Sequence, residues 1–160
     1  MKQLVTYLND HLAGSVSAVE LLDHLIQRHQ DDPLGKLLHQ VRADIVADQD
    51  VLKKIVHRFN AGESSFRKAA AWLAEKVARA KINLGRQKTR QLGLLEALEA
   101  LVLGVTGKQL LWRSLNASIG DSPLLRGIDL TNLEERAIEQ IERLELQRLE
   151  IAREVLLRMK

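Results

Sequence analysis

The sequence predicts an all-α fold built from four long helices. Leucine and alanine dominate the 46% of residues that are hydrophobic, aromatic residues make up only 3%, and the 160-residue chain has just two prolines. Runs of β-branched residues, which favour strands, are absent. A chain of this length is expected to form one helical-bundle domain, residues 1–160, around a single core.

Residues that start and stop helices divide the chain. Asp32 is placed to cap a helix that has Pro33 at its first position, and residues 60–62 (Asn-Ala-Gly) are expected to end that helix. Residues 131–134 (Thr-Asn-Leu-Glu) match a capping box. We therefore expect helices over residues 2–30, 33–59, 91–118 and 130–159.

Each expected helix carries an apolar seam whose members are spaced by three and four residues, as in a bundle. Polar side chains interrupt these seams at Ser15, Asp48, Gln109 and Arg148. A buried carboxylate is costly unless it is paired. We therefore hypothesise that Asp48 and Arg148 pair in a polar layer of the core. The alternative is that these residues lie at the margins of the seams and face water.

Positive charge is concentrated between residues 67 and 90. The whole chain has a net charge of +3, whereas this segment has +7 and the remainder has −4. The basic residues are Arg67, Lys68, Lys76, Arg79, Lys81, Arg86, Lys88 and Arg90. Residues 61–90 are long enough to return the chain along a bundle, so we expect a helical crossover that makes the second and third long helices parallel. The alternative is a weak, salt-sensitive site for nucleic acid or another anion.

Two helical hairpins joined by a long crossover resemble the ferritin-like superfamily, in particular its small, uncharacterised bacterial members. The resemblance rests on layout and covers nearly the whole chain. It implies a site for two metal ions, held by glutamates and by Glu-x-x-His pairs. However, all five histidines lie in the first two helices, and Val51 follows Asp48 where a histidine would be needed. We therefore expect no metal and no cofactor.

Other chemistries lack their motifs. The chain has no cysteine, which excludes disulfides and thiolate chemistry and is compatible with the cytoplasm. Residues 104–108 (Gly-Val-Thr-Gly-Lys) fail the P-loop spacing, so we interpret Gly104 and Gly107 as sites of close helix approach and expect Lys108 to be exposed. The most apolar stretch, residues 92–105, is too short to cross a bilayer, so no membrane insertion is expected.

The function predicted from these features is a non-catalytic, metal-free structural or interaction module. A second stripe on the last helix, Leu146, Leu149 and Leu156, predicts a homodimer. Anion binding through residues 67–90 and a divergent di-metal oxidoreductase or iron-binding protein are the alternatives.

Overall fold

The computed structural model describes residues 2–59 and 90–157, and within them all regular structure is helical. The four long helices are α1 (Lys2–Arg28), α2 (Pro33–Phe59), α4 (Arg90–Ile119) and α5 (Leu130–Leu157). A single 3-10 turn, η1 (Pro123–Leu125), lies between α4 and α5. The described residues thus confirm the all-α expectation. The expected crossover lies outside them, except for Arg90.

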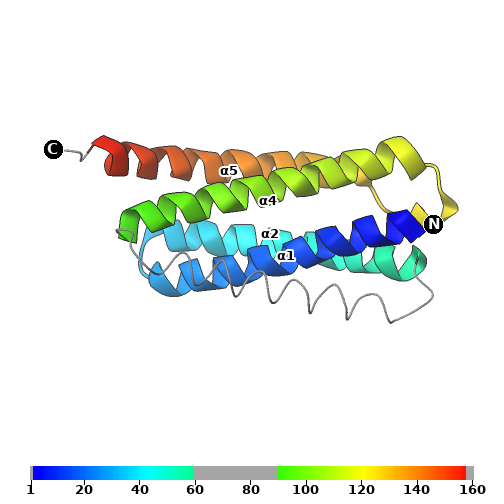
Figure 1. The fold of residues 1–160 in the computed structure, drawn as a ribbon, viewed down its shortest axis with the longest axis horizontal. Helices are drawn as coiled ribbons and strands as arrows, with labels where there is room; N and C mark the ends of the chain where they lie inside the picture. Colours follow the sequence, from blue (N-terminus) through cyan, green and yellow to red (C-terminus); the bar gives the residue numbers. More distant parts are fainter. Residues whose placement is uncertain (1, 60–89, 158–160) are drawn as a thin grey trace.

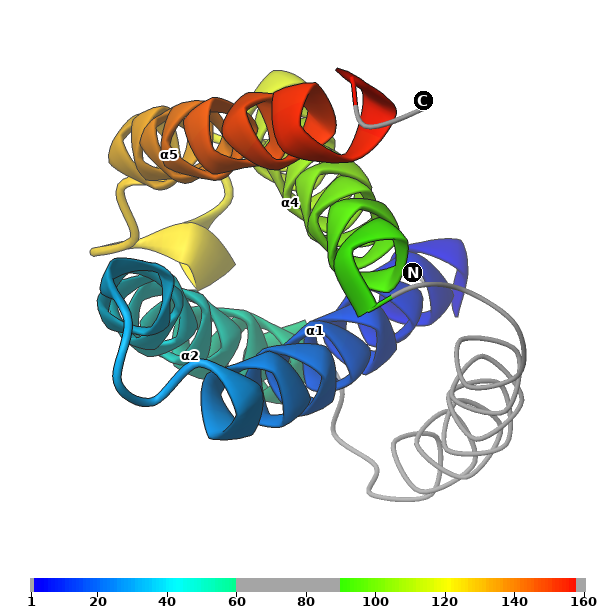
Figure 2. The same ribbon diagram turned by 90° about the vertical axis from the view of Figure 1, so that its left-hand side faces the viewer.

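The helices form two antiparallel hairpins, α1 with α2 and α4 with α5 (Figure 1). Seen along the bundle, α1 also neighbours α4, and α2 neighbours α5 (Figure 2). Both α2 and α4 begin at the same end of the bundle, so they run in the same direction (Figure 1). Among α1, α2, α4 and α5, every pair of neighbouring helices is therefore antiparallel.

The turn between α1 and α2 is held by Asp32 and permitted by Gly35. The Oδ1 atom of Asp32 accepts a hydrogen bond of 2.9 Å from the Gly35 N–H, so Asp32 caps α2 and Pro33 is the first helical residue. Burial raises the pKa of the Asp32 carboxyl, but hydrogen bonds from His29 and Gly35 outweigh that effect and lower its pKa. A Cβ atom on residue 35 would lie 1.8 Å from the carbonyl oxygen of His29. Only glycine therefore fits this position without movement of the turn.

Replacing Gly35 by alanine is expected to lower the free energy of unfolding by about 1–3 kcal/mol, because the added methyl group forces the α1–α2 turn apart. Gly107→Ala is the matched control, since a Cβ atom there meets nothing within 4 Å. That change should stabilise α4 by about 0.5–1 kcal/mol through helix propensity alone. Urea denaturation measures both variants, and equal stability of the two would contradict the expected clash.

The start of α5 differs from the expected capping box. The Asp129 carboxylate, not the Thr131 hydroxyl, accepts the capping hydrogen bond, which comes from the Asn132 N–H at 2.9 Å. The helix consequently begins at Leu130. Aspartate caps helices at least as well as threonine. The expected first residue of the helix is thus confirmed, whereas the expected capping residue is wrong.

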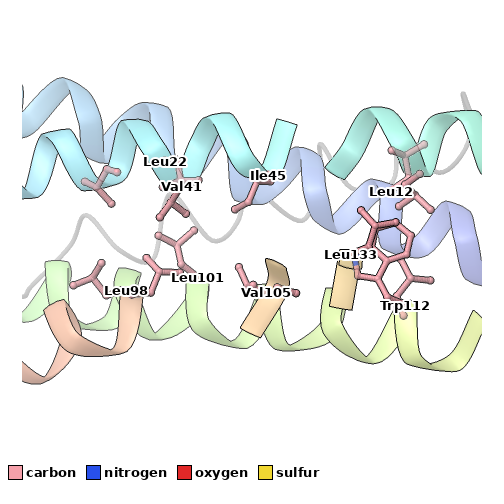
Figure 3. Packing of buried hydrophobic residues seen from close by; sticks show 14 of the residues in the cluster. Leu12, Leu22, Val41, Ile45, Leu98, Leu101, Val105, Trp112 and Leu133 are labelled. Atoms are coloured by element: carbon pink, nitrogen blue, oxygen red, sulfur yellow. The ribbon is translucent and has the colours of Figure 1, made fainter. Parts of the chain in front are cut away.

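The core is a continuous leucine-rich layer between the two hairpins. Side chains of α1 and α2 such as Leu22 and Val41 face Leu98 and Leu101 of α4 (Figure 3). Trp112 is fully buried nearer the other end of the bundle, beside Leu12 and Leu133 (Figure 3). No helix in the described part of the chain is long and apolar enough to cross a membrane.

Candidate functional site

The core contains one dense group of polar side chains, which we call the core polar cluster: Asp48 of α2, Lys108 of α4, and Arg136 and Gln140 of α5. The Lys108 ammonium lies 2.6 Å from the Oδ2 atom of Asp48 and also donates to the Gln140 side-chain oxygen. The Gln140 amide nitrogen donates to the same Oδ2 atom at 3.0 Å. These three side chains close a ring of hydrogen bonds that joins three helices.

Burial determines the electrostatics of this cluster. The Asp48 side chain is completely buried, and that of Lys108 is 13% exposed. Burial lowers the pKa of the Lys108 amine, while the charge of Asp48 and its hydrogen bond act in the opposite direction. Arg136 approaches from the edge of the bundle, with its Nη2 atom 3.0 Å from the Oδ1 atom of Asp48. That contact is ionic rather than a well-aligned hydrogen bond, because the same Oδ1 atom has no hydrogen-bond partner among the described residues.

The counter-ion of Asp48 differs from the one expected, because Arg148 is engaged elsewhere. The Arg148 guanidinium makes two hydrogen bonds to Glu145, three residues earlier on α5, and approaches Glu99 of α4 at 3.5 Å. Lys108 and Arg136 take its place beside Asp48. The hypothesis of an Asp48–Arg148 pair is therefore wrong.

Of the other two expected polar-layer residues, only Ser15 lies near Asp48. Ser15 of α1 accepts a hydrogen bond of 2.9 Å from the Gln49 amide, next to Asp48 along α2. Gln109 is half-buried on α4, one residue beyond Lys108. Asp48 and Ser15 thus line one region of the core, whereas α4 contributes Lys108 to it rather than Gln109.

The expectations for residues 104–108 also need correction. Lys108 is not exposed but belongs to the core polar cluster. A Cβ atom at Gly104 or Gly107 would meet nothing within 4 Å, so neither glycine marks a close helix approach. The sequence does contain a pattern that predicts burial of Lys108, because Lys108 continues an apolar seam of α4 whose members are spaced by four and three residues. The seam runs Leu94, Leu98, Leu101, Val105, Lys108, Trp112, Leu115. Gln140 similarly continues the buried series Leu130, Leu133, Ala137 and Leu144 on α5.

The donor set around Asp48 does not fit the di-metal site that the ferritin-like resemblance implies. Such a site needs several carboxylates and histidines facing one another. Asp48 instead faces one lysine and one arginine, whose positive charges oppose a divalent cation. Within residues 2–59 and 90–157, no three His, Asp or Glu side chains gather in a way that could hold a metal ion.

Of the eight basic residues expected to bind an anion, seven (Arg67, Lys68, Lys76, Arg79, Lys81, Arg86 and Lys88) lie outside the described residues. Arg90 is the first residue of α4, and its guanidinium donates a hydrogen bond of 3.3 Å to the carbonyl oxygen of Arg28 at the end of α1. Arg90 therefore satisfies a carbonyl group at a helix terminus. Anion binding by this segment stays a prediction.

A cavity of about 370 Å³ lies beside the core polar cluster, between α1, α2 and α4. Its walls combine apolar side chains with Asp48 and Lys108. Trp112 also lines it, and the buried Nε1 atom of this indole has no hydrogen-bond partner among the described residues. Buried polar groups of native proteins are nearly always paired, so this cavity is a candidate binding site.

A second candidate surface is the outward face of α5. We define the α5 outer stripe as Ile138, Glu142, Leu146, Leu149, Arg153 and Leu156, all of which are exposed. From Glu142 onward its members alternate steps of three and four residues, as on one face of a coiled coil. Leu146 is 67% exposed and Leu156 is 57% exposed. In addition to the seam that fills the core, the helix therefore presents a second seam, in which apolar residues alternate with Glu142 and Arg153.

Comparison with known proteins adds no relative to this description. No protein-family model, no curated protein and no solved structure matches the chain.

Proposed function

We propose that this protein is a non-catalytic interaction module of ferritin-like layout that works as a homodimer joined through α5. The observation that carries the proposal is the α5 outer stripe. Isolated exposed leucines are common on protein surfaces, but exposed apolar residues that share one helix face with coiled-coil spacing are typical of an interface, and the stripe has four: Ile138, Leu146, Leu149 and Leu156. From Ile138 to Leu156 the stripe extends about 27 Å along the helix.

Charge along the stripe favours an antiparallel arrangement of two copies. If a two-fold axis passes between Leu146 and Leu149, Leu146 of each copy packs on Leu149 of the other. The same register places Glu142 of each copy against Arg153 of the other, which forms two complementary pairs. A parallel arrangement would instead bring Glu142 against Glu142 and Arg153 against Arg153. The charges of the stripe are thus complementary in an antiparallel dimer and repulsive in a parallel one.

Other observations support the layout, the non-catalytic role and the cellular setting. The ferritin-like layout is supported by the two antiparallel hairpins and by the common direction of α2 and α4. A non-catalytic role is supported by the pairing of Asp48 with cations inside the core. A bacterial cytoplasmic setting is supported by the layout resemblance and by the lack of cysteine.

Sedimentation equilibrium tests the dimer through a charge exchange. The wild-type chain of 18.1 kDa is expected to sediment at twice that mass. Glu142→Arg and Arg153→Glu should each weaken association, because each places like charges together twice in the dimer. The double variant should restore association, since the complementary pairs are then regenerated with their signs reversed.

Two further variants complete this test. Leu146→Glu combined with Leu149→Glu should give a monomer with unchanged helix content. Leu103→Glu is the control, because Leu103 is 73% exposed but lies on α4, outside the stripe. A monomeric wild-type chain would overturn the proposal, and a double charge variant that fails to associate would overturn the antiparallel register.

A further inference from the structure

The cavity beside the core polar cluster reaches the surface between α1 and α4. Gly14 of α1 and Gly104 of α4 both line it, and both are exposed. A Cβ atom at either position would meet nothing within 4 Å. The opening is therefore formed by two residues that have no side chains, and the cavity volume of about 370 Å³ lies within the range of small-molecule sites.

Among the described residues, Lys108 alone brings a primary amine to this cavity. Its side chain is 13% exposed, whereas the side chain of Lys53 on α2 is 47% exposed. Burial lowers the pKa of the Lys108 amine, and the charge of Arg136 acts in the same direction. The carboxylates of Asp48 and Asp44 oppose this change without reversing it. Lys108 therefore releases its proton more readily than a lysine in water, and the free amine is a nucleophile.

A proton acceptor lies next to this amine. The Oδ2 atom of Asp48 is 2.6 Å from the Nζ atom of Lys108. The side-chain oxygen of Gln140 accepts a second hydrogen bond from the same Nζ atom and so holds the amine beside the carboxylate. A desolvated amine with a proton acceptor within hydrogen-bond reach is arranged to add to a carbonyl compound.

The other walls of the cavity suit an uncharged, apolar body. They include hydrophobic and aromatic side chains: Tyr7, Ile45, Leu52, Val105, Leu111 and Trp112. Burial also lowers the pKa of His11, more than Asp10 raises it, which favours the uncharged ring at neutral pH. Asp48 and Lys108 are paired with each other, and Asp10 is exposed. The walls therefore favour a hydrocarbon chain over an ionic group.

We propose that Lys108 forms a reversible imine with small apolar aldehydes that enter this cavity. The amine supplies the covalent bond, and the apolar walls bind the hydrocarbon chain of the aldehyde. This inference concerns the interior of the bundle and does not depend on the α5 interface. It describes covalent binding without turnover, so it is compatible with a non-catalytic role.

The reaction is a condensation that consumes no oxidant or reductant. Asp48 accepts one proton from the Lys108 ammonium, and the free amine bonds to the carbonyl carbon while the electrons of the C=O π bond move to oxygen. That oxygen receives two protons, one from the nitrogen and one back from Asp48, and leaves as water with the electrons of the C–O bond. The nitrogen keeps one proton, so the iminium ion retains its positive charge beside Asp48.

Reductive alkylation tests the proposal on the wild-type chain. Sodium cyanoborohydride reduces an imine to a stable secondary amine, and peptide mass mapping then measures each lysine separately. At pH 7, hexanal should label Lys108 at least about tenfold faster than the exposed Lys54 of α2, because the bound chain holds the carbonyl group next to the amine. A rate at Lys108 that does not exceed the rate at Lys54 would overturn the proposal.

The length of the aldehyde tests the role of the apolar walls. Propanal should label Lys108 at least about tenfold more slowly than hexanal, because it buries three fewer methylene groups. At Lys54 the two aldehydes should react at similar rates. An excess of 1-hexanol, which has the chain but no carbonyl group, should protect Lys108 and leave Lys54 unaffected. Equal rates of the two aldehydes at Lys108 would overturn the proposal.

The location is tested by filling the opening. Gly104→Leu should lower the labelling of Lys108 by hexanal at least about tenfold, since the added side chain occupies the entrance. The matched control is Gly107→Leu, three residues further along α4, which also has open space for a side chain but does not line the cavity. Wild-type labelling of Lys108 in a folded Gly104→Leu variant would overturn the proposal.

Lys108→Arg separates the imine from simple apolar binding. Arginine keeps a positive charge beside Asp48, but its guanidinium stays protonated and cannot form an imine. In wild type, hexanal should raise the melting temperature more than the same concentration of 1-hexanol. In Lys108→Arg the two compounds should act alike, with the native circular dichroism spectrum retained. A folded Lys108→Arg variant that still distinguishes hexanal from 1-hexanol would overturn the proposal.

Discussion

Replacing Asp48 by alanine is expected to lower the free energy of unfolding by about 3–5 kcal/mol. The carboxylate is completely buried and accepts hydrogen bonds from Lys108 and Gln140. Its removal leaves the Lys108 ammonium largely buried without a counter-ion, and Gln140 loses the acceptor of its amide group. An uncompensated buried charge is more costly than the loss of the attraction itself, which explains the size of the effect.

Urea denaturation followed by far-UV circular dichroism measures this change, at one protein concentration throughout because the proposed dimer would also contribute to stability. Asp50→Ala is the matched control on the same helix, since Asp50 is exposed and pairs only with Lys53 among the described residues. We expect that control to stay within about 0.5 kcal/mol of wild type. The double variant Asp48→Leu with Lys108→Met should recover much of the loss, because it removes both buried charges. An Asp48→Ala variant as stable as Asp50→Ala would show that the cluster does not hold the core.

The second large effect is expected for Leu98→Ala, which should cost about 2–5 kcal/mol. Leu98 is fully buried on α4 and lies in the core layer opposite α1 and α2 (Figure 3). Truncation to alanine removes three buried carbon atoms and leaves a void that helices of a packed bundle cannot fully close. Leu98 does not line the cavity beside the core polar cluster, so the loss reports on core packing alone.

Leu103→Ala is the control for Leu98, with the same chemical change five residues further along α4. Because Leu103 is 73% exposed, its truncation should alter the free energy of unfolding by no more than about 0.5 kcal/mol. Thermal or chemical denaturation of both variants gives the comparison. Similar losses at the two positions would contradict the orientation of α4 in the structure.

The rotation of α4 about its own axis could not be predicted correctly from the sequence. Leucines occur on more than half of the circumference of this helix. The sequence therefore contains two apolar seams, offset by one residue, and either of them could face the core. The seam through Leu95, Val102 and Gln109 makes Gln109 the polar core residue. The bundle buries Leu94, Leu101 and the Lys108 side chain, and it also buries Leu95, but it leaves Val102 and Gln109 half-buried. An offset of one residue corresponds to a rotation of the helix by about 100°. This rotation places the Lys108 ammonium in the core, where the sequence had predicted the Gln109 amide.

The sequence by itself determined the all-α class, the four long helices and the cap at Asp32, because periodicity, propensity and capping act over a few residues. Only the tertiary structure decided which cation meets Asp48. Arg148 finds Glu145 one turn away on its own helix, whereas Lys108 reaches Asp48 because α2, α4 and α5 converge on one layer. The cavity has the same origin, since Gly14 and Gly104 form an opening only when two helices distant in sequence lie side by side. Contacts between distant segments depend on the rotation and spacing of whole helices, and these are set by the packing of the complete core.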